Sequence, residues 1–173
     1  MHIIVDGYNL IRRSDGLRRA ERHSLEAGRK ELVRRLSSYR RMKHSRITVV
    51  FDGWEGGQFL EEREMENGVA VIYSRRGEKA DEVIKRLAAK EKKDAIIVTS
   101  DRGLADAVRR AGSTAVSSDE FEKIMARASW TSPERKDETE NRMYSRDGTK
   151  KKGPSRRPSK KDKAYQSSIK KLQ

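Results

Sequence analysis

Five short runs of apolar, mostly β-branched residues recur along the first 130 residues of the chain. The runs are His2–Val5, Ile47–Phe51, Val69–Tyr73, Ala95–Thr99 and Thr114–Val116. Several are continuously apolar instead of alternating with polar residues, which is typical of parallel strands that are covered on both faces. The pattern therefore predicts a five-stranded, mostly parallel sheet.

Apolar residues with helical spacing fill the segments between these runs. They fall on one face of a helix in four segments, near residues 25–39, 80–88, 104–111 and 121–128. We expect Ser24 to cap the first of these helices, Gly112 to end the third, and the pattern Ser117-x-x-Glu120 to open the fourth. Strands and helices that alternate at this spacing predict a three-layer α/β domain.

The composition changes after Trp130. Residues 131–173 contain 14 Lys and Arg, six Asp and Glu, all three prolines, and only a few widely spaced large apolar residues. Such a segment buries too little apolar surface to offset the entropy lost on ordering. We therefore expect one globular domain over residues 1–130 and a disordered basic tail over residues 131–173.

Several classes of protein are excluded by the composition. The 173 residues include no cysteine, so disulfide frameworks, thiolate zinc sites and cysteine nucleophiles are ruled out. No apolar run approaches the roughly 20 residues of a membrane span, and the N-terminus lacks the layout of a signal peptide, so we expect a cytoplasmic protein without membrane contact. A net charge of +14 makes a polyanion, first of all RNA or DNA, the expected partner.

Aspartates stand at the ends of three of the predicted strands. Asp6, Asp52 and Asp101 each follow an apolar run. Ligands of parallel α/β sheets bind beyond the carboxyl ends of the strands, so we expect these side chains to share one rim of the sheet.

A fourth acidic side chain is expected from the helix near residues 80–88. Helical geometry places Asp81 at the edge of the apolar face, while Glu78 and Glu82 fall further round and are expected to be more exposed. Asp81 is thus the preferred site residue. Glu78 is the second choice, because it stands where the helix begins.

Oxygen ligands without His or Cys are typical of the hard cations Mg²⁺ or Mn²⁺, and clustered carboxylates raise one another's pKa unless a cation is present. We expect Asp6, Asp81 and Asp101 to hold one or two such ions, with Asn9 and Asp52 in support. These ions would activate a water for in-line displacement at a phosphodiester, leaving a 5′-phosphate.

Each of these residues also has a purely structural interpretation. An aspartate after a strand is often an N-cap or a turn former. Asp52-Gly53 is a common turn dipeptide, Asp101 could cap the third helix, and Asn9 could form an Asx turn. The four glutamates of the segment that follows Asp52 are expected to lie in a solvated acidic loop: Glu61, Glu62, Glu64 and Glu66.

Taken together, four motifs resemble the YacP-like branch of NYN domains, in the PIN-like nuclease superfamily. The motifs are Asp6-Gly7-Tyr8-Asn9, Val49-Val50-Phe51-Asp52-Gly53, Gly77-Glu78-Lys79-Ala80-Asp81 and Val98-Thr99-Ser100-Asp101-Arg102. The resemblance covers residues 1–128 and leaves the tail outside. It implies a Rossmann-like domain and a metal-dependent endoribonuclease, which in some members cleaves mRNA at the ribosome. It makes Asp6, Asp81 and Asp101 the acidic centre, with Asn9 and Asp52 nearby. We add Glu78 and Ser100, which stand within these motifs, as further supporting residues.

RNA needs positive charge around such an acidic pocket. The candidate phosphate and base contacts are Arg12, Arg13, Arg76, Arg102 and an aromatic ring from Tyr8 or Trp54. The alternative is that the arginines are ordinary solvated side chains and that Tyr8 is packed beneath the rim.

Two other functions remain open at this point. A non-catalytic RNA- or ribosome-binding protein would explain the charge equally well, but it has no evident need for the acids. A phosphotransfer domain also places an aspartate after a strand. The Asp-x-Asp-x-Thr motif of phosphatases and the paired acids of receivers are both absent after the first run.

Overall fold

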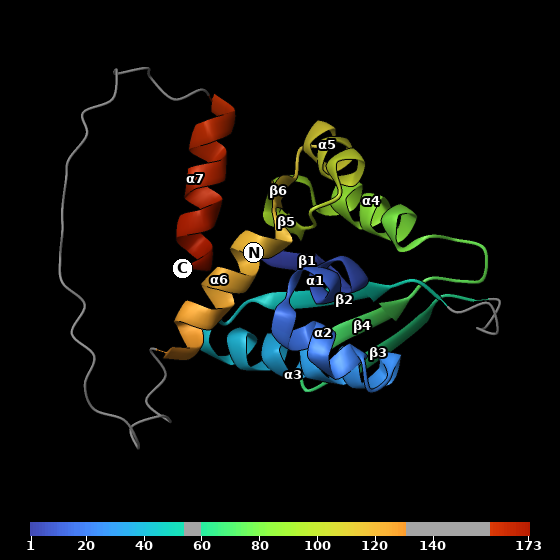
Figure 1. The fold of residues 1–173 in the computed structure, drawn as a ribbon. Coiled ribbons are helices and arrows are strands. Elements are labelled where there is room, and N and C mark those ends of the chain that lie inside the picture. The colour runs from blue at the N-terminus through green and yellow to red at the C-terminus, as the bar shows by residue number, and fades with distance from the viewer. Residues whose placement is uncertain (54–59, 131–159) are drawn as a thin grey trace, which may run out of the picture.

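The computed structural model of the chain describes residues 1–53, 60–130 and 160–173. Its sheet has the strand order β3-β4-β2-β1-β5-β6 (Figure 1). The strands are β1 (His2–Asp6), β2 (Arg46–Phe51), β3 (Glu62–Glu66), β4 (Val69–Tyr73), β5 (Ala95–Val98) and β6 (Thr114–Val116). Every neighbouring pair is parallel except β3 and β4. The five predicted strands are confirmed, and the sheet is mostly parallel.

Seven α-helices are found in the described residues. They are α1 (Gly7–Arg13), α2 (Asp15–Glu21), α3 (Leu25–Lys43), α4 (Ala80–Glu91), α5 (Arg102–Arg110), α6 (Ser118–Trp130) and α7 (Lys160–Leu172), with a short 3-10 turn at Lys92–Asp94. The four predicted helices correspond to α3, α4, α5 and α6. Ser24 caps α3, because its hydroxyl accepts the backbone N–H of Ala27 at 2.9 Å. The short, arginine-rich helices α1 and α2 were not predicted.

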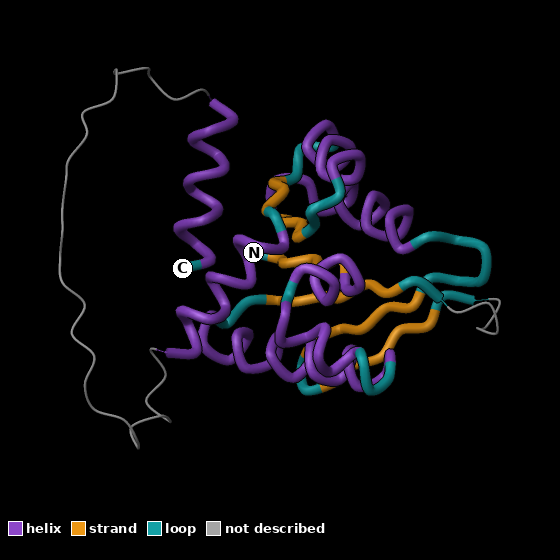
Figure 2. Tube along the Cα trace, in the orientation of Figure 1, coloured by secondary structure: helices purple, strands orange, loops and turns teal. Residues whose placement is uncertain are grey.

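The strands form the middle layer between two layers of helices (Figure 2). Successive side chains of a strand point to opposite faces, so Ile3 and Val5 pack with α1, α2, α3 and α6, whereas Ile4 packs with α4 and α5. All three are fully buried. This arrangement confirms the predicted three-layer α/β domain.

The sheet has six strands, not the five predicted, because the acidic segment does not form a loop throughout. Glu62–Glu66 form β3, an edge strand that pairs antiparallel with β4. The turn between them consists of Asn67 and Gly68, both with positive φ (50° and 82°). Asn-Gly is a strong signal for a two-residue hairpin, and it outweighs the polar character of the strand.

The expected disorder of the basic tail is wrong for its last part. Lys160–Leu172 form α7, because Tyr165, Ile169 and Leu172 are spaced as one helical stripe. Leu172 is fully buried in the core and Ile169 is 8% exposed. The Tyr39 hydroxyl donates to the Leu172 carbonyl oxygen at 2.5 Å. Residues 131–159 lie outside the described residues, so the predicted domain boundary at residue 130 stays a prediction.

Candidate functional site

Four aspartates stand at the carboxyl ends of the parallel strands, the edge to which the arrows point in Figure 1. Asp6 is the last residue of β1, Asp52 follows β2, Asp101 follows β5 by three residues, and Asp81 is the second residue of α4. Asp6 is buried, Asp81 is half-buried, and Asp52 and Asp101 are exposed. The topology therefore brings the predicted acids to one rim.

The strand-end aspartates also cap helices, as the structural interpretation predicted. Asp6 accepts from the backbone N–H of Asn9 at 3.3 Å, and Asp101 accepts from that of Leu104 at 2.7 Å. Asp52 accepts from the backbone N–H of Ala80 at 2.7 Å, at the start of α4. Capping does not remove these carboxylates from the site, because it fixes each of them at the rim.

Burial sets the ionisation of Asp6. Its side chain accepts a second hydrogen bond, from the Thr99 hydroxyl at 3.0 Å. Loss of solvent around the carboxylate raises the pKa of Asp6 to about 6, and the negative charges of Asp81 and Asp52 add to the rise. Asp6 therefore carries charge at neutral pH at a cost in free energy.

The pKa of Asp81 is raised as well. Partial burial raises its pKa first, and the charges of Asp101 and Asp52 raise it further. Lys85, one helical turn further along α4, acts in the opposite direction. Asp81 is thus near enough to repel Asp6, Asp52 and Asp101, although the four aspartates lie far apart in the sequence.

The donor chemistry of this rim suits a hard cation, but a coordination shell is not preformed. Carboxylate and amide oxygens from Asp6, Asp81, Asp101 and Asn9 are the ligand types that Mg²⁺ and Mn²⁺ prefer. Within the residues that the structure describes, no three acidic or histidine side chains lie close enough together to hold an ion directly. The rim thus offers concentrated negative charge and oxygen donors, but not a complete set of ligands around one position.

Asn9 connects three elements around the acids. Its side-chain oxygen accepts from the Ser100 backbone N–H at 2.9 Å and from the Ser118 hydroxyl at 2.8 Å. The Ser100 hydroxyl in turn accepts from the Ser118 backbone N–H at 3.1 Å. Asn9 and Ser100, both predicted as supporting residues, therefore hold α1, the end of β5 and α6 together.

Thr99 is a site residue that the sequence analysis missed. Its hydroxyl donates to Asp6 and accepts from the backbone N–H of Asp101 at 3.1 Å. It thus connects two of the three aspartates that the sequence predicts to hold a cation. Its position at the end of a predicted strand, two residues before Asp101, was the available signal.

The motifs that follow β1 and β2 both read Asp-Gly, and packing explains why each aspartate is followed by glycine. A Cβ on Gly7 would stand 2.3 Å from the ring of Phe51, and a Cβ on Gly53 would stand 1.9 Å from the carbonyl oxygen of Ser74. A side chain at position 7 would force the Phe51 ring to move, and one at position 53 would force the Ser74 backbone to move. The glycines are therefore packing requirements of the rim, not merely turn residues.

Glu78 is engaged by arginines instead of joining the acids. Its carboxylate forms ion pairs with Arg75 (3.3 Å) and Arg86 (2.7 Å), which leave its side chain 11% exposed. The expected high exposure of Glu78 is wrong, because the two arginines cover it. Glu82 is exposed as predicted.

Tyr8 occupies a packed position. Its ring meets that of Phe51 edge-to-face, with 5.2 Å between centroids, and its hydroxyl accepts from Arg29 Nε at 2.8 Å. The alternative interpretation of Tyr8 as a residue beneath the rim thus describes its surroundings. Trp54, the other candidate ring, lies outside the described residues.

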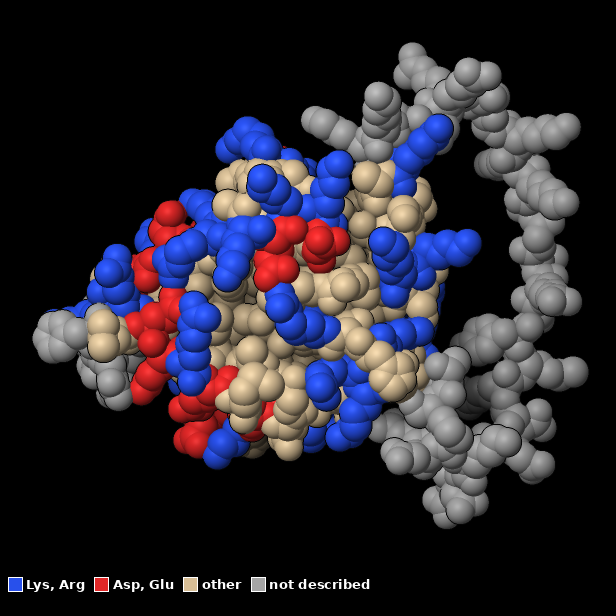
Figure 3. Space-filling model, turned by 180° about the vertical axis from the view of Figure 1, so that it is seen from behind, with Lys and Arg blue, Asp and Glu red and all other residues tan. Residues whose placement is uncertain are grey.

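The four arginines predicted to bind RNA are all exposed: Arg12, Arg13, Arg76 and Arg102. None forms an ion pair with another described residue. Lys and Arg side chains cover much of the rear face of the molecule, with smaller acidic patches between them (Figure 3). No helix in the described part of the chain has the length and apolar character needed to cross a membrane.

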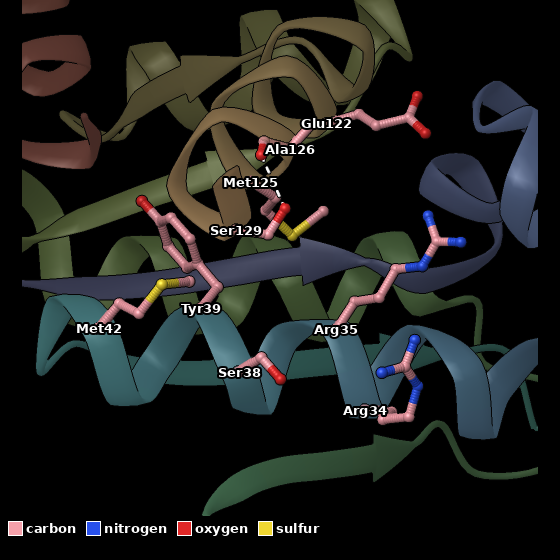
Figure 4. Close-up of a pocket in the computed structure, with 9 residues that line it drawn as sticks. All are labelled: Arg34, Arg35, Ser38, Tyr39, Met42, Glu122, Met125, Ala126 and Ser129. Carbon is pink, nitrogen blue, oxygen red and sulfur yellow. Dashed lines mark hydrogen bonds between the residues drawn. The ribbon is translucent and has the colours of Figure 1, made fainter. Parts of the chain in front are cut away.

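A cavity of about 260 Å³ lies between α3 and α6, away from the aspartates (Figure 4). Tyr39 and Met42 line it from α3, and Met125 lines it from α6. None of the predicted site residues contributes to it. It is therefore not part of the candidate site.

The chain is similar in sequence to known proteins of one family. The profile of the YacP-like NYN domain matches residues 3–168, beyond the expected end at residue 128 and into α7. The uncharacterized protein YacP of Bacillus subtilis (strain 168) is 34% identical over 86 residues, which is half of each chain.

Two crystal structures of Rae1 (YacP) from Bacillus subtilis resemble the fold. The structure of a single-substitution mutant, with leucine in place of a tryptophan, matches with a TM-score of 0.64 and 26% identity over 75% of this chain and 77% of that one. A second crystal structure of Rae1 matches with a TM-score of 0.63 and 28% identity over 75% and 76%.

Proposed function

The chain belongs to the YacP-like NYN domain family, a branch of the PIN-like nuclease superfamily, and on this premise we propose that it is a metal-dependent endoribonuclease. The natural substrate would be mRNA, cleaved in the cytoplasm and in association with the ribosome. The net charge of +14 supports an RNA partner, because the acidic rim by itself repels phosphates.

One observation carries the proposal: the topology brings Asp6, Asp52, Asp81 and Asp101 to one rim, where Asp52 and Asp81 raise the pKa of Asp6 and where Asp52 and Asp101 raise that of Asp81. Burial and mutual repulsion of carboxylates cost folding free energy. A protein that only binds RNA gains nothing from this cost. A hydrolase that needs a divalent cation does gain from it, because clustered carboxylates bind the cation and the cation removes their repulsion.

Asp6, Asp81 and Asp101 would hold the Mg²⁺ or Mn²⁺. A bound divalent cation lowers the pKa of a water molecule and neutralises charge on a phosphate. Thr99 and the Asn9 backbone N–H hold the Asp6 carboxylate in place, and the Leu104 backbone N–H holds that of Asp101. The residues of this chain thus position the donors before substrate arrives.

The reaction is a hydrolysis at phosphorus. A water oxygen forms a bond to the phosphorus atom, the bond from phosphorus to the 3′ oxygen breaks, and that oxygen takes up a proton. The products carry a 5′-phosphate and a 3′-hydroxyl. The exposed side chains of Arg12, Arg76 and Arg102 balance the charge of the flanking phosphates.

The test compares wild type with Asp101→Asn on labelled RNA with Mg²⁺ or Mn²⁺. Asparagine caps a helix as well as aspartate does, so this variant keeps the α5 cap and loses only the charge. Asp106→Asn, an exposed aspartate of α5, is the matched control. We expect cutting by wild type and by the control, and a loss of about 100-fold or more in Asp101→Asn. Cutting at full rate in EDTA would disprove the proposal.

A non-catalytic RNA- or ribosome-binding protein is the second candidate. The lack of a preformed group of three carboxylates among the described residues favours it. The wild type would then bind RNA tightly without cutting it, even when translating ribosomes and mRNA are supplied. That result would support the binding function and reject the nuclease.

A further inference from the structure

An open groove of about 1020 Å³ lies along the β4–α4 loop and the first two turns of α4, the helix that carries Asp81. The residues that line it carry five cationic side chains against two carboxylates: Arg75, Arg76, Gly77, Glu78, Lys79, Glu82, Lys85 and Arg86. A Cβ on Gly77 would meet no atom within 4 Å, so the groove is open at the loop. Its size and charge suit a polyanion.

Part of this positive charge is already used within the protein. Glu78 pairs with Arg75 and Arg86, and Arg86 also pairs with Glu61. These pairs shape the wall of the groove. Arg76 and Lys79 are exposed and form no ion pair with any residue that the structure describes, so they remain available to a ligand.

Lys85 stands between the groove and the acids. It follows Asp81 by one helical turn, and its ammonium group is attracted by both Asp81 and Asp101. It also forms an ion pair with Glu82 at 2.7 Å, and its side chain is 39% exposed. A phosphate in the groove that contacts Lys85 would therefore lie one helical turn from Asp81.

We propose that this groove binds the backbone phosphates of single-stranded RNA and that Lys85 contacts the phosphate nearest to the aspartates. The inference rests on the proposed nuclease function, and it adds the path by which the substrate reaches the acids. Lys85 lies six residues after Lys79, the N-cap residue of α4, which corresponds to about 9 Å of helix. That length suits a few phosphates of one strand and is short against the roughly 16 base pairs that double-stranded RNA-binding domains span.

Glu82 competes with RNA for Lys85. Its carboxylate holds the ammonium group in the free protein, so RNA must displace it. Neutralising Glu82 therefore strengthens RNA binding, whereas neutralising Lys85 weakens it. An ion pair that merely supports α4 would produce no such opposite effects.

The experiment measures binding of a fluorescein-labelled single-stranded RNA by fluorescence anisotropy, with the full chain and in EDTA so that no cutting occurs. Lys79→Gln and Lys85→Gln are expected to raise Kd about three- to tenfold and to flatten the salt dependence by about 0.7 in slope. Glu82→Gln is expected to lower Kd about two- to threefold.

Two variants serve as matched controls. Lys90→Gln removes a cation near the other end of α4, and Asp106→Asn removes a carboxylate whose partner Arg109 repeats the three-residue spacing of the Glu82–Lys85 pair. Both are expected to change Kd less than about twofold. Equal effects of Lys85→Gln and Lys90→Gln, or of Glu82→Gln and Asp106→Asn, would show that only net charge matters and would overturn the proposal.

Binding in EDTA also separates this inference from the nuclease proposal. Cutting by wild type, with normal RNA binding by Lys79→Gln and Lys85→Gln, would leave the nuclease intact and reject the groove. Weakened binding by these two variants, in a protein that never cuts RNA, would support the groove and reject the nuclease.

Discussion

The carboxylate of Asp52 accepts the backbone N–H of Ala80, so the residue after β2 fixes the first residue of α4. Lys79, the N-cap residue of α4, provides no side-chain cap of its own. Because Asp81 follows Ala80 directly, the position of one rim aspartate depends on another. The Asp-Gly dipeptide after β2 is thus more than a turn.

Replacement of Asp52 tests this dependence. Asp52→Ala removes the cap and is expected to cost about 1 kcal/mol of unfolding free energy, together with a loss of RNA cleavage. Asp52→Asn keeps a cap acceptor and is expected to retain the stability. Chemical denaturation measures the difference, and equal stability of the two variants would refute the capping role.

The raised pKa of Asp6 makes stability depend on pH. Its pKa is about 6 in the folded protein against an ordinary value of 3.8, so the folded state binds more protons between about pH 4 and 6. The contribution of Asp6 to the unfolding free energy therefore falls as pH rises through this window, by about 3 kcal/mol at most. Asp6→Asn is expected to remove this dependence, to be more stable than wild type at pH 7.5, and to be inactive. Urea unfolding from pH 4 to 8 measures it, and identical pH profiles would contradict the assignment.

Divalent cations are expected to stabilise the wild type by relieving the repulsion at the rim. Mg²⁺ or Mn²⁺ at 100 times its Kd would add about 2.7 kcal/mol to the unfolding free energy. Asp101→Asn and Asp6→Asn should gain much less, and Asp106→Asn should respond as wild type does. Thermal unfolding with and without the metal tests this, and an equal gain by Asp101→Asn and wild type would contradict it.

Gly53 has no room for a side chain. Gly53→Ala would place a Cβ 1.9 Å from the Ser74 carbonyl oxygen, which must move together with the loop that leads to α4. We expect a loss of at least about 2 kcal/mol of unfolding free energy and a loss of cleavage. Gly103→Ala is the comparison for stability alone, because a Cβ on Gly103 would meet only Oδ1 of Asp101, at 3.3 Å. Chemical denaturation measures both variants, and equal stability of Gly53→Ala and wild type would contradict the prediction.

Helix α7 belongs to the hydrophobic core. Leu172→Ala removes a fully buried side chain and is expected to cost about 2–4 kcal/mol of unfolding free energy. Lys170→Ala, on the exposed side of α7, should stay within about 0.5 kcal/mol of wild type. A Leu172→Ala variant as stable as wild type would show that α7 does not dock in solution.

The parallel strands and the aspartates after β1, β2 and β5 could be predicted from the sequence, because an apolar run with Asp close behind it is a local pattern. Asp81 could be predicted from the spacing of the apolar residues in its helix. The edge strand Glu62–Glu66 could not, since its stability comes from backbone pairing with β4 and an Asn-Gly turn and not from its own side chains. Helix α7 escaped prediction for a similar reason. Its three apolar residues have helical spacing, but they are few and stand among lysines, and their burial depends on the core that they meet.

The sequence predicted which aspartates lie in the site but not which residues the side chains of the site contact. Asp81 was favoured over Glu78 by helical geometry, yet what holds the Glu78 carboxylate is Arg86, eight residues further on. The roles of Thr99 and Ser118 depend on contacts with residues 93 and 109 positions away. No local pattern encodes such contacts.

These long-range bonds have a consequence for the timing of activity. Asp6 is anchored by Thr99 and Asn9 by Ser118, so the carboxylates reach their places only when β5 and the start of α6 have docked against the first strand. Contacts of this sequence separation cost more loop-closure entropy than local contacts do. A chain in which β5 and the start of α6 have not docked would accordingly lack the arrangement of carboxylates on which the proposed hydrolysis depends.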